Sequence, residues 1–157
     1  MDKTSVLFVC LGNICRSPAA EAIFQKLIND KGIGNRFIVD SAGTGNWHLG
    51  KKADTRMRFA AKQRNIYITS NARQIREDDF RNFNYILVMD DSNLNNVIDL
   101  KNRVKGSDFA KIIKIQDFSS NFTEKEVPDP YFGGDAGFEH VLDILEDSVS
   151  CFLENIT

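Results

Sequence analysis

The sequence predicts an α/β fold: a single domain with a four-stranded parallel sheet and helices on both of its faces. Short apolar runs alternate with segments whose apolar residues recur at helical spacing. The strand-like runs are continuously apolar, as is typical of parallel strands buried on both faces. A length of 157 residues suits one domain. This alternation predicts parallel strands joined by helical crossovers.

The first part of the chain predicts a strand, a helix and a second strand. Residues 5–9 are rich in β-branched and aromatic side chains, which favours a buried strand. A helix is expected to begin at Ser17 and Pro18, because serine suits the N-cap and proline the first turn. The second strand is expected over residues 36–40. The apolar stripe of the helix consists of Ala20, Ile23, Phe24, Leu27 and Ile28, with Gly32 as its stop.

The rest of the chain continues the alternation and closes with a long helix. A helix follows the second strand, and a third strand, a helix and a fourth strand come next. A segment with two prolines and a glycine pair then looks irregular, and a segment of this length in so small a domain is more often functional than idle. The expected ranges are 54–64, 85–89, 92–101 and 110–115, the irregular segment 117–134, and a final helix with its stripe over 138–152.

Four candidate positions fall where the predicted strands end. In parallel sheets, ligands bind beyond the carboxyl ends of the strands. The site is therefore expected at this edge of the sheet, near Cys10, Ser41, Asp90 and Asp117.

The composition excludes several classes of function. With 20 basic and 22 acidic side chains the net charge is −2, whereas nucleic acids and anionic membranes call for basic excess. No apolar run approaches the ~18 residues of a membrane span, and no basic leader precedes the first strand, so a cytoplasmic protein is expected. Three cysteines and two histidines predict neither a disulfide scaffold nor a zinc site.

The segment between the first strand and the first helix carries the chemistry. Residues 10–18 read Cys-Leu-Gly-Asn-Ile-Cys-Arg-Ser-Pro, a C-x5-R-S pattern. Such a loop points backbone amides inward and forms a cradle for a tetrahedral dianion. Arg16 would close the cradle with its planar fork. Gly12 is expected to supply backbone freedom, and Asn13 to bond within the loop or adopt a left-handed conformation. The predicted phosphate-binding residues are Leu11, Gly12, Asn13, Ile14, Cys15, Arg16 and Ser17.

Cys10 lies at the floor of this predicted cradle. The amides and the guanidinium would favour its thiolate, which is a nucleophile aimed at phosphorus. Ser17 can cap the helix, donate to the Cys10 sulfur, or do both. A bare C-x5-R pattern is weak, but the inner G-N-x-C and the following Ser-Pro make this one specific.

These residues resemble the low-molecular-weight protein tyrosine phosphatases, and the resemblance covers nearly the whole chain as one domain, 1–157. It implies hydrolysis of phosphotyrosine in proteins, and of small aryl phosphates, through a phosphocysteine intermediate. It also implies inhibition by phosphate and vanadate, and no metal or organic cofactor. The other matching segments are Asp40-Ser41-Ala42-Gly43-Thr44, Ala72-Arg73-Gln74, Asp79-Phe80, Met89-Asp90 and Ser92-Asn93-Leu94.

Asp129 is the candidate proton donor. Cleaving a phosphate ester requires a proton on the leaving oxygen, and a loop carboxylic acid can supply it. The sequence alone equally allows an Asp-Pro turn, but Asp129-Pro130-Tyr131 resembles the family segment that supplies its general acid. The resemblance places Trp47 at the pocket wall. Trp47 and Tyr131 both lie in loops with glycine or proline, which favours a wall position over a core position.

Several other residues leave alternatives open. Asp90 is either a helix cap or a partner of Asp129 and the loop. His48 is expected at the pocket rim and His140 at the surface, and Cys151 is expected to be inert. Many family members have a second tyrosine after the Asp-Pro pair, so Phe132 leaves Tyr131 alone for phosphorylation.

Cys15 is the second thiol of the loop. It either packs the loop or forms a disulfide with an oxidised Cys10, which would protect the nucleophile from irreversible oxidation.

Three other functions compete. A thioredoxin-coupled arsenate reductase needs resolving cysteines in the latter half of the chain, and none lies between Cys15 and Cys151. A protein-arginine phosphatase has a threonine where this chain has Ile14, and an apolar side chain suits a phenyl ring better. A non-catalytic phosphate-binding module would lack the nucleophile, the arginine or the acid.

Overall fold

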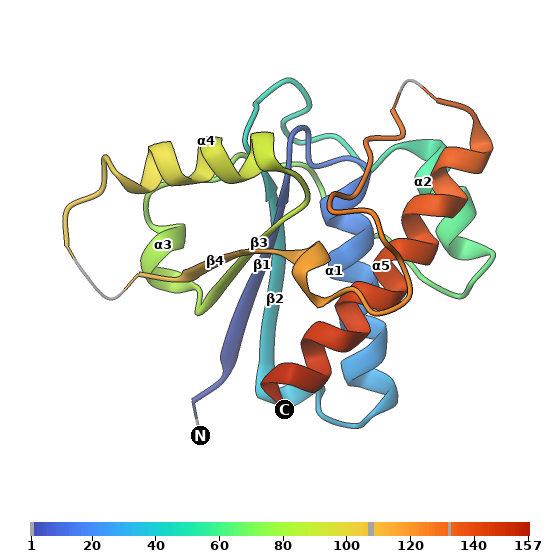
Figure 1. The fold of residues 1–157 in the computed structure, drawn as a ribbon, viewed down its shortest axis with the longest axis horizontal. Helices are drawn as coiled ribbons and strands as arrows, with labels where there is room; N and C mark the ends of the chain where they lie inside the picture. The colour runs from blue at the N-terminus through green and yellow to red at the C-terminus, as the bar shows by residue number, and fades with distance from the viewer. Residues whose placement is uncertain (1, 107–108, 132) are drawn as a thin grey trace.

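The computed structural model describes residues 2–106, 109–131 and 133–157. These residues form the predicted four-stranded parallel sheet, and its strand order is β2-β1-β3-β4 (Figure 1). The strands are β1 (Thr4–Cys10), β2 (Phe37–Gly43), β3 (Tyr85–Val88) and β4 (Lys111–Lys114).

Helices cover both faces of the sheet, which confirms the predicted architecture (Figure 1). On one face α1 packs against α5, and α2 also packs against α5. On the other face α4 contacts β3 and β4. The helices are α1 (Arg16–Asp30), α2 (Thr55–Lys62), α3 (Asp79–Asn82), α4 (Asp91–Lys101) and α5 (Asp135–Ile156), with 3₁₀ turns η1 (Gly34–Arg36) and η2 (Ile115–Phe118).

Strand β1 lies in the middle of the molecule and contributes to both cores. Successive strand side chains point to opposite faces. Phe8 and Cys10 belong to the core under α1 and α5, whereas Leu7 and Val9 belong to the core on the α4 side. Both faces are buried, which explains why the strand is apolar from Val6 to Cys10. Cys10 is the last residue of this rigid strand.

The second strand is longer than predicted. It extends to Gly43, whereas the sequence pattern ended it at Asp40. Serine, alanine and glycine have low strand propensity, but tertiary pairing overrides that preference. Here Ser41, Ala42 and Gly43 pair in parallel with Phe8, Val9 and Cys10.

The start of α1 also differs from the prediction. The helix begins at Arg16, and Cys15 occupies the N-cap without a side-chain cap bond. The predicted N-cap role of Ser17 is therefore wrong. Pro18 still lies in the first turn, where its missing N–H costs nothing. Between β2 and β3 the chain also forms α3, a single turn that the apolar pattern did not indicate.

Of the four strand-end positions, Cys10, Ser41 and Asp90 contribute to the site described below. Asp117 is exposed in η2 and does not line the cavity there. In the part of the chain that the structure describes, no helix is long and apolar enough to cross a bilayer.

Candidate active site

The loop that joins β1 to α1 curls over the Cys10 sulfur. Asn13 has φ of 57°, the left-handed conformation expected for it, and its backbone N–H donates to Cys10 Sγ at 3.3 Å. Gly12 has no positive φ, so the expected backbone freedom is not what it provides. Instead it leaves room: a Cβ at Gly12 would lie 3.1 Å from His48 Cδ2.

The end of β2 supports the other side of this loop. The backbone N–H of Gly45 donates to the Leu11 carbonyl at 2.9 Å, and that of Thr44 to the Cys10 carbonyl at 2.9 Å. A Cβ at Gly43 would lie 2.7 Å from the Leu11 carbonyl oxygen. Only glycine at position 43 allows the loop to lie this close to the strand.

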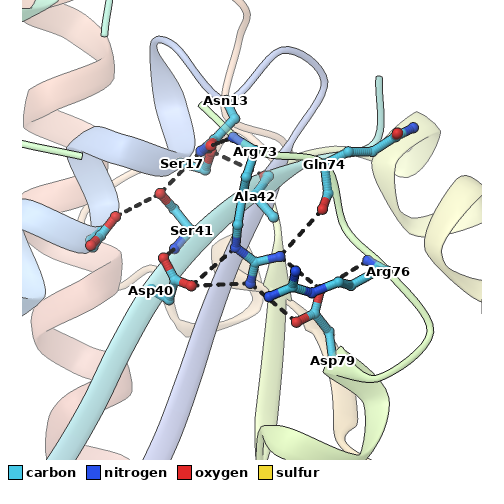
Figure 2. A network of polar contacts seen from close by, with 10 residues as sticks. Asn13, Ser17, Asp40, Ser41, Ala42, Arg73, Gln74, Arg76 and Asp79 are labelled. Atoms are coloured by element: carbon cyan, nitrogen blue, oxygen red, sulfur yellow. Dashed lines mark hydrogen bonds and ion pairs between the residues drawn. The ribbon is translucent and has the colours of Figure 1, made fainter. Parts of the chain in front are cut away.

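A hydrogen-bond network behind the loop orients the Cys10 thiol. The Arg73 backbone N–H donates to Asn13 Oδ1 at 3.0 Å, which fixes the orientation of the Asn13 amide. Asn13 Nδ2 then donates to Ser17 Oγ at 2.8 Å and to Ser41 Oγ at 3.0 Å (Figure 2). Ser17 Oγ lies 3.0 Å from Cys10 Sγ and 3.4 Å from the Ala42 carbonyl oxygen, so its single proton can go to either of them. The contacts of Asn13 and Ser17 thus fix the position of the Cys10 sulfur.

Charged groups anchor the far side of the network. Ser41 Oγ donates to Glu21 Oε1 at 2.6 Å, and burial raises the pKa of Glu21. Figure 2 shows the Arg73 guanidinium between Asp40 and Asp79, which it contacts at 3.0 Å each. Burial alone would lower the pKa of Arg73, but these two carboxylates raise it. Arg73 therefore stays charged and holds the network in place.

Arg16 lies beside the thiol and is only 2% exposed. Its Nη1 donates to Asp90 Oδ2 at 2.7 Å and to the Val127 carbonyl at 2.9 Å. Its Nη2 lies 3.6 Å from Asp129 Oδ2. Burial by itself lowers the pKa of Arg16, but the Cys10 sulfur and the Asp90 carboxylate outweigh it and raise the pKa. The cradle therefore contains a permanent cation.

Asp90 is the helix cap that the sequence allowed, and its other partner is Arg16 of the loop rather than Asp129. Its Oδ1 accepts from the Asn93 backbone N–H at 2.8 Å, as the N-cap of α4. Its Oδ2 pairs with Arg16 at 2.7 Å. One side chain thus joins a helix terminus to the guanidinium of the site.

The loop, the Asp129 segment and the Trp47 segment enclose a cavity of about 200 Å³. Trp47 is 65% exposed, so it forms a wall and is not part of the core. The rings of His48 and Tyr131 lie 6.0 Å apart at this cavity. Asn13 and Ser17 do not line it and act from behind the loop. The lining residues are Cys10, Leu11, Gly12, Ile14, Cys15, Arg16, Trp47, His48, Asp129 and Tyr131.

Asp129 lies on an exposed stretch of the loop with its carboxylate directed to the cavity. Its Oδ1 accepts from the Tyr131 backbone N–H at 3.1 Å. The intervening Pro130 is buried and fixes the backbone between them. Phe132, which stands where many family members have a second tyrosine, lies outside the described residues.

The remaining thiols and histidine lie in different environments. Cys15 is 4% exposed, and its pKa is raised by burial and then by the carboxylate of Asp54, so it is a protonated thiol at neutral pH. His140 contacts Glu124 at 2.6 Å on the surface. Cys151 is partly buried on α5, and all three cysteines are unpaired. Within the described ranges, no cluster of His, Cys, Asp and Glu could hold a metal ion.

A thiol among hydrogen-bond donors, a buried guanidinium and a loop carboxylate is an arrangement suited to phosphoryl transfer. Residues 5–157 match the family model for low molecular weight phosphotyrosine protein phosphatase. The Schizosaccharomyces pombe protein of that name is 45% identical over 154 residues, covering 96% of each chain.

Solved structures agree with this match. A protein tyrosine phosphatase from Entamoeba histolytica is 44% identical with a TM-score of 0.92, over 98% of this chain and 97% of that one. An arginine phosphatase from Drosophila is 33% identical, also with a TM-score of 0.92, over 97% of each chain. With its cradle, its fold and its sequence all in agreement, the chain belongs to the low molecular weight phosphotyrosine protein phosphatase family.

Proposed function

We propose that this chain hydrolyses phosphotyrosine in proteins, and small aryl phosphates, through a phosphocysteine intermediate formed on Cys10. The observation that carries the proposal is the position of Cys10 Sγ. It lies at the cavity floor, 3.0 Å from Ser17 Oγ and 3.3 Å from the Asn13 backbone nitrogen. The Asn13 backbone N–H donates to this sulfur, and its thiolate would be the nucleophile of the reaction.

Arg16 and the amides at the start of α1 would bind the phosphate. Both protons of Arg16 Nη1 are already donated, to Asp90 and Val127. The edge formed by Nε and Nη2 therefore faces the phosphate oxygens and grips two of them. The N-cap residue Cys15 makes no side-chain cap bond, which leaves the first amides of α1 available for the anion.

The reaction would proceed in two displacements. The Cys10 sulfur attacks phosphorus as the bond to the tyrosine oxygen breaks, and Asp129 gives its proton to that oxygen. Water then attacks the phosphocysteine, the Asp129 carboxylate takes a proton from it, and the S–P bond breaks. Inorganic phosphate leaves, and Cys10 and Asp129 return to their starting states.

Substituting Cys10 tests the first displacement. Cys10→Ser should abolish turnover of p-nitrophenyl phosphate while vanadate still binds. Acid-quenched wild-type enzyme should carry phosphate on Cys10 by mass spectrometry. Cys151→Ser, which changes a thiol far from the cavity, is the matched control and should keep full activity. Retention of more than a few per cent of kcat in Cys10→Ser would defeat the assignment.

Ile14 provides a test of substrate class, because a solved relative is an arginine phosphatase. Ile14 is 8% exposed and lines the cavity, where an apolar side chain packs well against a phenyl ring. We therefore expect a higher kcat/KM for a phosphotyrosine peptide than for the same peptide carrying phosphoarginine. A preference for phosphoarginine would move the proposal to that substrate.

Two further expectations belong to this proposal. Phosphate and vanadate should inhibit, since each is a tetrahedral oxyanion that fits the cradle. The proposed compartment is the cytoplasm, because a catalytic thiolate with unpaired Cys15 and Cys151 requires a reducing environment.

A further inference from the structure

One side chain of α2 reaches across to the loop that carries Asp129. Arg56 Nη2 donates to the Tyr131 carbonyl at 2.8 Å, and its Nη1 to the Gly133 carbonyl at 3.4 Å. The guanidinium carbon also lies 4.6 Å from the ring centre of Phe138 and 5.8 Å from that of Tyr131. Arg56 thus contacts the loop in two ways. It donates to backbone carbonyls of the loop, and its guanidinium lies near the rings of Tyr131 and Phe138.

Asp54 fixes the orientation of this guanidinium. Its Oδ1 accepts from Arg56 Nε at 3.2 Å and its Oδ2 from Nη2 at 3.1 Å, a bidentate pair. Burial would raise the pKa of Asp54, but the hydrogen bonds from Arg56 lower it. The backbone N–H of Asp54 donates to the Ile14 carbonyl at 2.8 Å. The Asp54–Arg56 pair therefore joins the phosphate loop to the loop of Asp129.

The other end of the Asp129 loop has its own attachment. The Val127 N–H donates to the Met89 carbonyl at 2.9 Å, and the Val127 carbonyl accepts from Arg16. Asp129 lies between this attachment and the contacts of Arg56, with its Oδ2 only 3.6 Å from Arg16 Nη2. The loop that carries Asp129 is therefore held by contacts on both sides of this residue.

We propose that Arg56 is a positioning residue, which holds the loop so that Asp129 remains over the cradle. This inference rests on the proposed function of Asp129 as general acid. Removing the Arg56 side chain frees the C-terminal end of the loop. Asp129 then spends less time within reach of the leaving oxygen. The loss of kcat/KM should depend on how much the leaving group needs that proton. It should therefore be largest for substrates with basic leaving groups.

Arg56→Ala and Arg56→Lys test the proposal, with Arg58→Ala as the matched control. Arg58 lies two residues further along α2, and its guanidinium donates to Ala53 and Thr55 at the start of the helix. The readout is kcat/KM for a series of aryl phosphates, from p-nitrophenyl to phenyl phosphate. For Arg56→Ala we expect a loss of about 10- to 100-fold on phenyl phosphate, the cost of a misplaced catalytic group. The loss on p-nitrophenyl phosphate should be several-fold smaller.

The conservative variant separates charge from geometry. A lysine keeps the charge but cannot make the bidentate pair with Asp54 while reaching two carbonyls. Arg56→Lys should therefore recover only part of the phenyl phosphate activity, and Arg58→Ala should match wild type on every substrate. The Tm values of Arg56→Ala and Arg58→Ala should both be close to that of wild type, which excludes a general loss of fold.

The double variant shows whether Arg56 acts through Asp129. In an Asp129→Asn background, which should itself lose roughly 10²- to 10⁴-fold on phenyl phosphate, adding Arg56→Ala should cost little more. Equal losses on all substrates, full additivity with Asp129→Asn, or no loss at all would overturn the positioning role. If Asp129→Asn shows no dependence on the leaving group, the acid itself is misassigned and the role of Arg56 falls with it. A leaving-group-dependent defect in Asp129→Asn with a normal Arg56→Ala overturns Arg56 alone.

Discussion

Two cysteines of one loop have different surroundings. Cys10 Sγ accepts from Asn13 and lies 3.0 Å from the Ser17 hydroxyl. Cys15 is buried beside Asp54, and its pKa is raised. Peroxide reacts with thiolates, so oxidation should begin at Cys10, and Cys15 can only attack the resulting sulfenic acid after losing its own proton.

The redox prediction follows from this difference. Attack of the Cys15 thiolate on the Cys10 sulfenic acid forms a disulfide and releases hydroxide. Peroxide-treated protein should recover activity with dithiothreitol, and Cys15→Ser should recover markedly less. Because the raised pKa keeps Cys15 protonated at neutral pH, the protection should increase as pH rises. Equal recovery of the two proteins would leave Cys15 as a packing residue.

Gly45 controls the position of the Trp47 wall. A Cβ at Gly45 would lie 1.8 Å from Trp47 Cζ3, so Gly45→Ala must displace the indole. Because Trp47 is 65% exposed, the ring can move without disturbing the core. We expect KM for aryl phosphates to rise by roughly 2- to 10-fold, the range of one lost aromatic pair, with kcat and Tm little changed. Trp47→Ala should show the same pattern, and an unchanged KM in both would remove Trp47 from the binding site.

At the scale of elements, α5 holds the segment that follows η2. The Asp147 carboxylate accepts from the backbone amides of Ser120 and Asn121 at 3.0 and 3.2 Å. It also accepts from the hydroxyls of Ser119 and Ser120 at 2.9 Å each. Burial would raise the pKa of Asp147, but these hydrogen bonds lower it. Asp147 therefore ties the start of the irregular segment to the last helix.

The lowered pKa sets the sign of a pH effect on stability. A carboxyl whose pKa is lower in the folded state stabilises the protein above its unfolded pKa, and this stabilisation is lost as pH falls through the folded pKa. Asp147→Asn should therefore lower the free energy of unfolding at pH 7, and the difference from wild type should shrink as the medium is made acidic. Urea unfolding at pH 7 and again below 3.8, the ordinary pKa of an aspartate, measures this, with the exposed Glu154→Gln on the same helix as control. A difference that stays constant with pH would contradict it.

The whole molecule should respond to an oxyanion, because the cradle joins β1 and α1 to the Asp129 loop. A ligand at 100 times its Kd stabilises the fold by about 2.7 kcal/mol. For a chain of this size that is a rise in Tm of roughly 5–11 °C. Vanadate should produce this shift with wild type and with Cys10→Ser. Arg16→Lys should respond much less, since an ammonium cannot grip two oxygens as a fork. No shift in any of the three would argue against an anion site.

The parts of this molecule that depend on local sequence pattern could be predicted from the sequence. Apolar runs located the strands, and the spacing of Cys10 and Arg16 located the cradle. The pattern missed contacts between distant residues. Arg73 donates to Asn13 across 60 positions, and Arg56 reaches Tyr131 across 75. No periodicity or propensity indicates such pairs, because they form only when the sheet and its crossovers bring the segments together.

These distant contacts tie enzymatic competence to the completion of folding. The phosphate loop is held by Gly45, Asp54 and Arg73, each of which arrives from a later part of the chain. Closing such long intervals costs conformational entropy, so parallel sheets of this kind assemble slowly. A nascent or partly refolded chain with its helices formed would have the Cys10 sulfur but no ordered cradle around it. During refolding, the return of catalytic activity therefore reports on the final step, in which the cradle becomes ordered. It should lag behind the recovery of the circular dichroism signal of the helices.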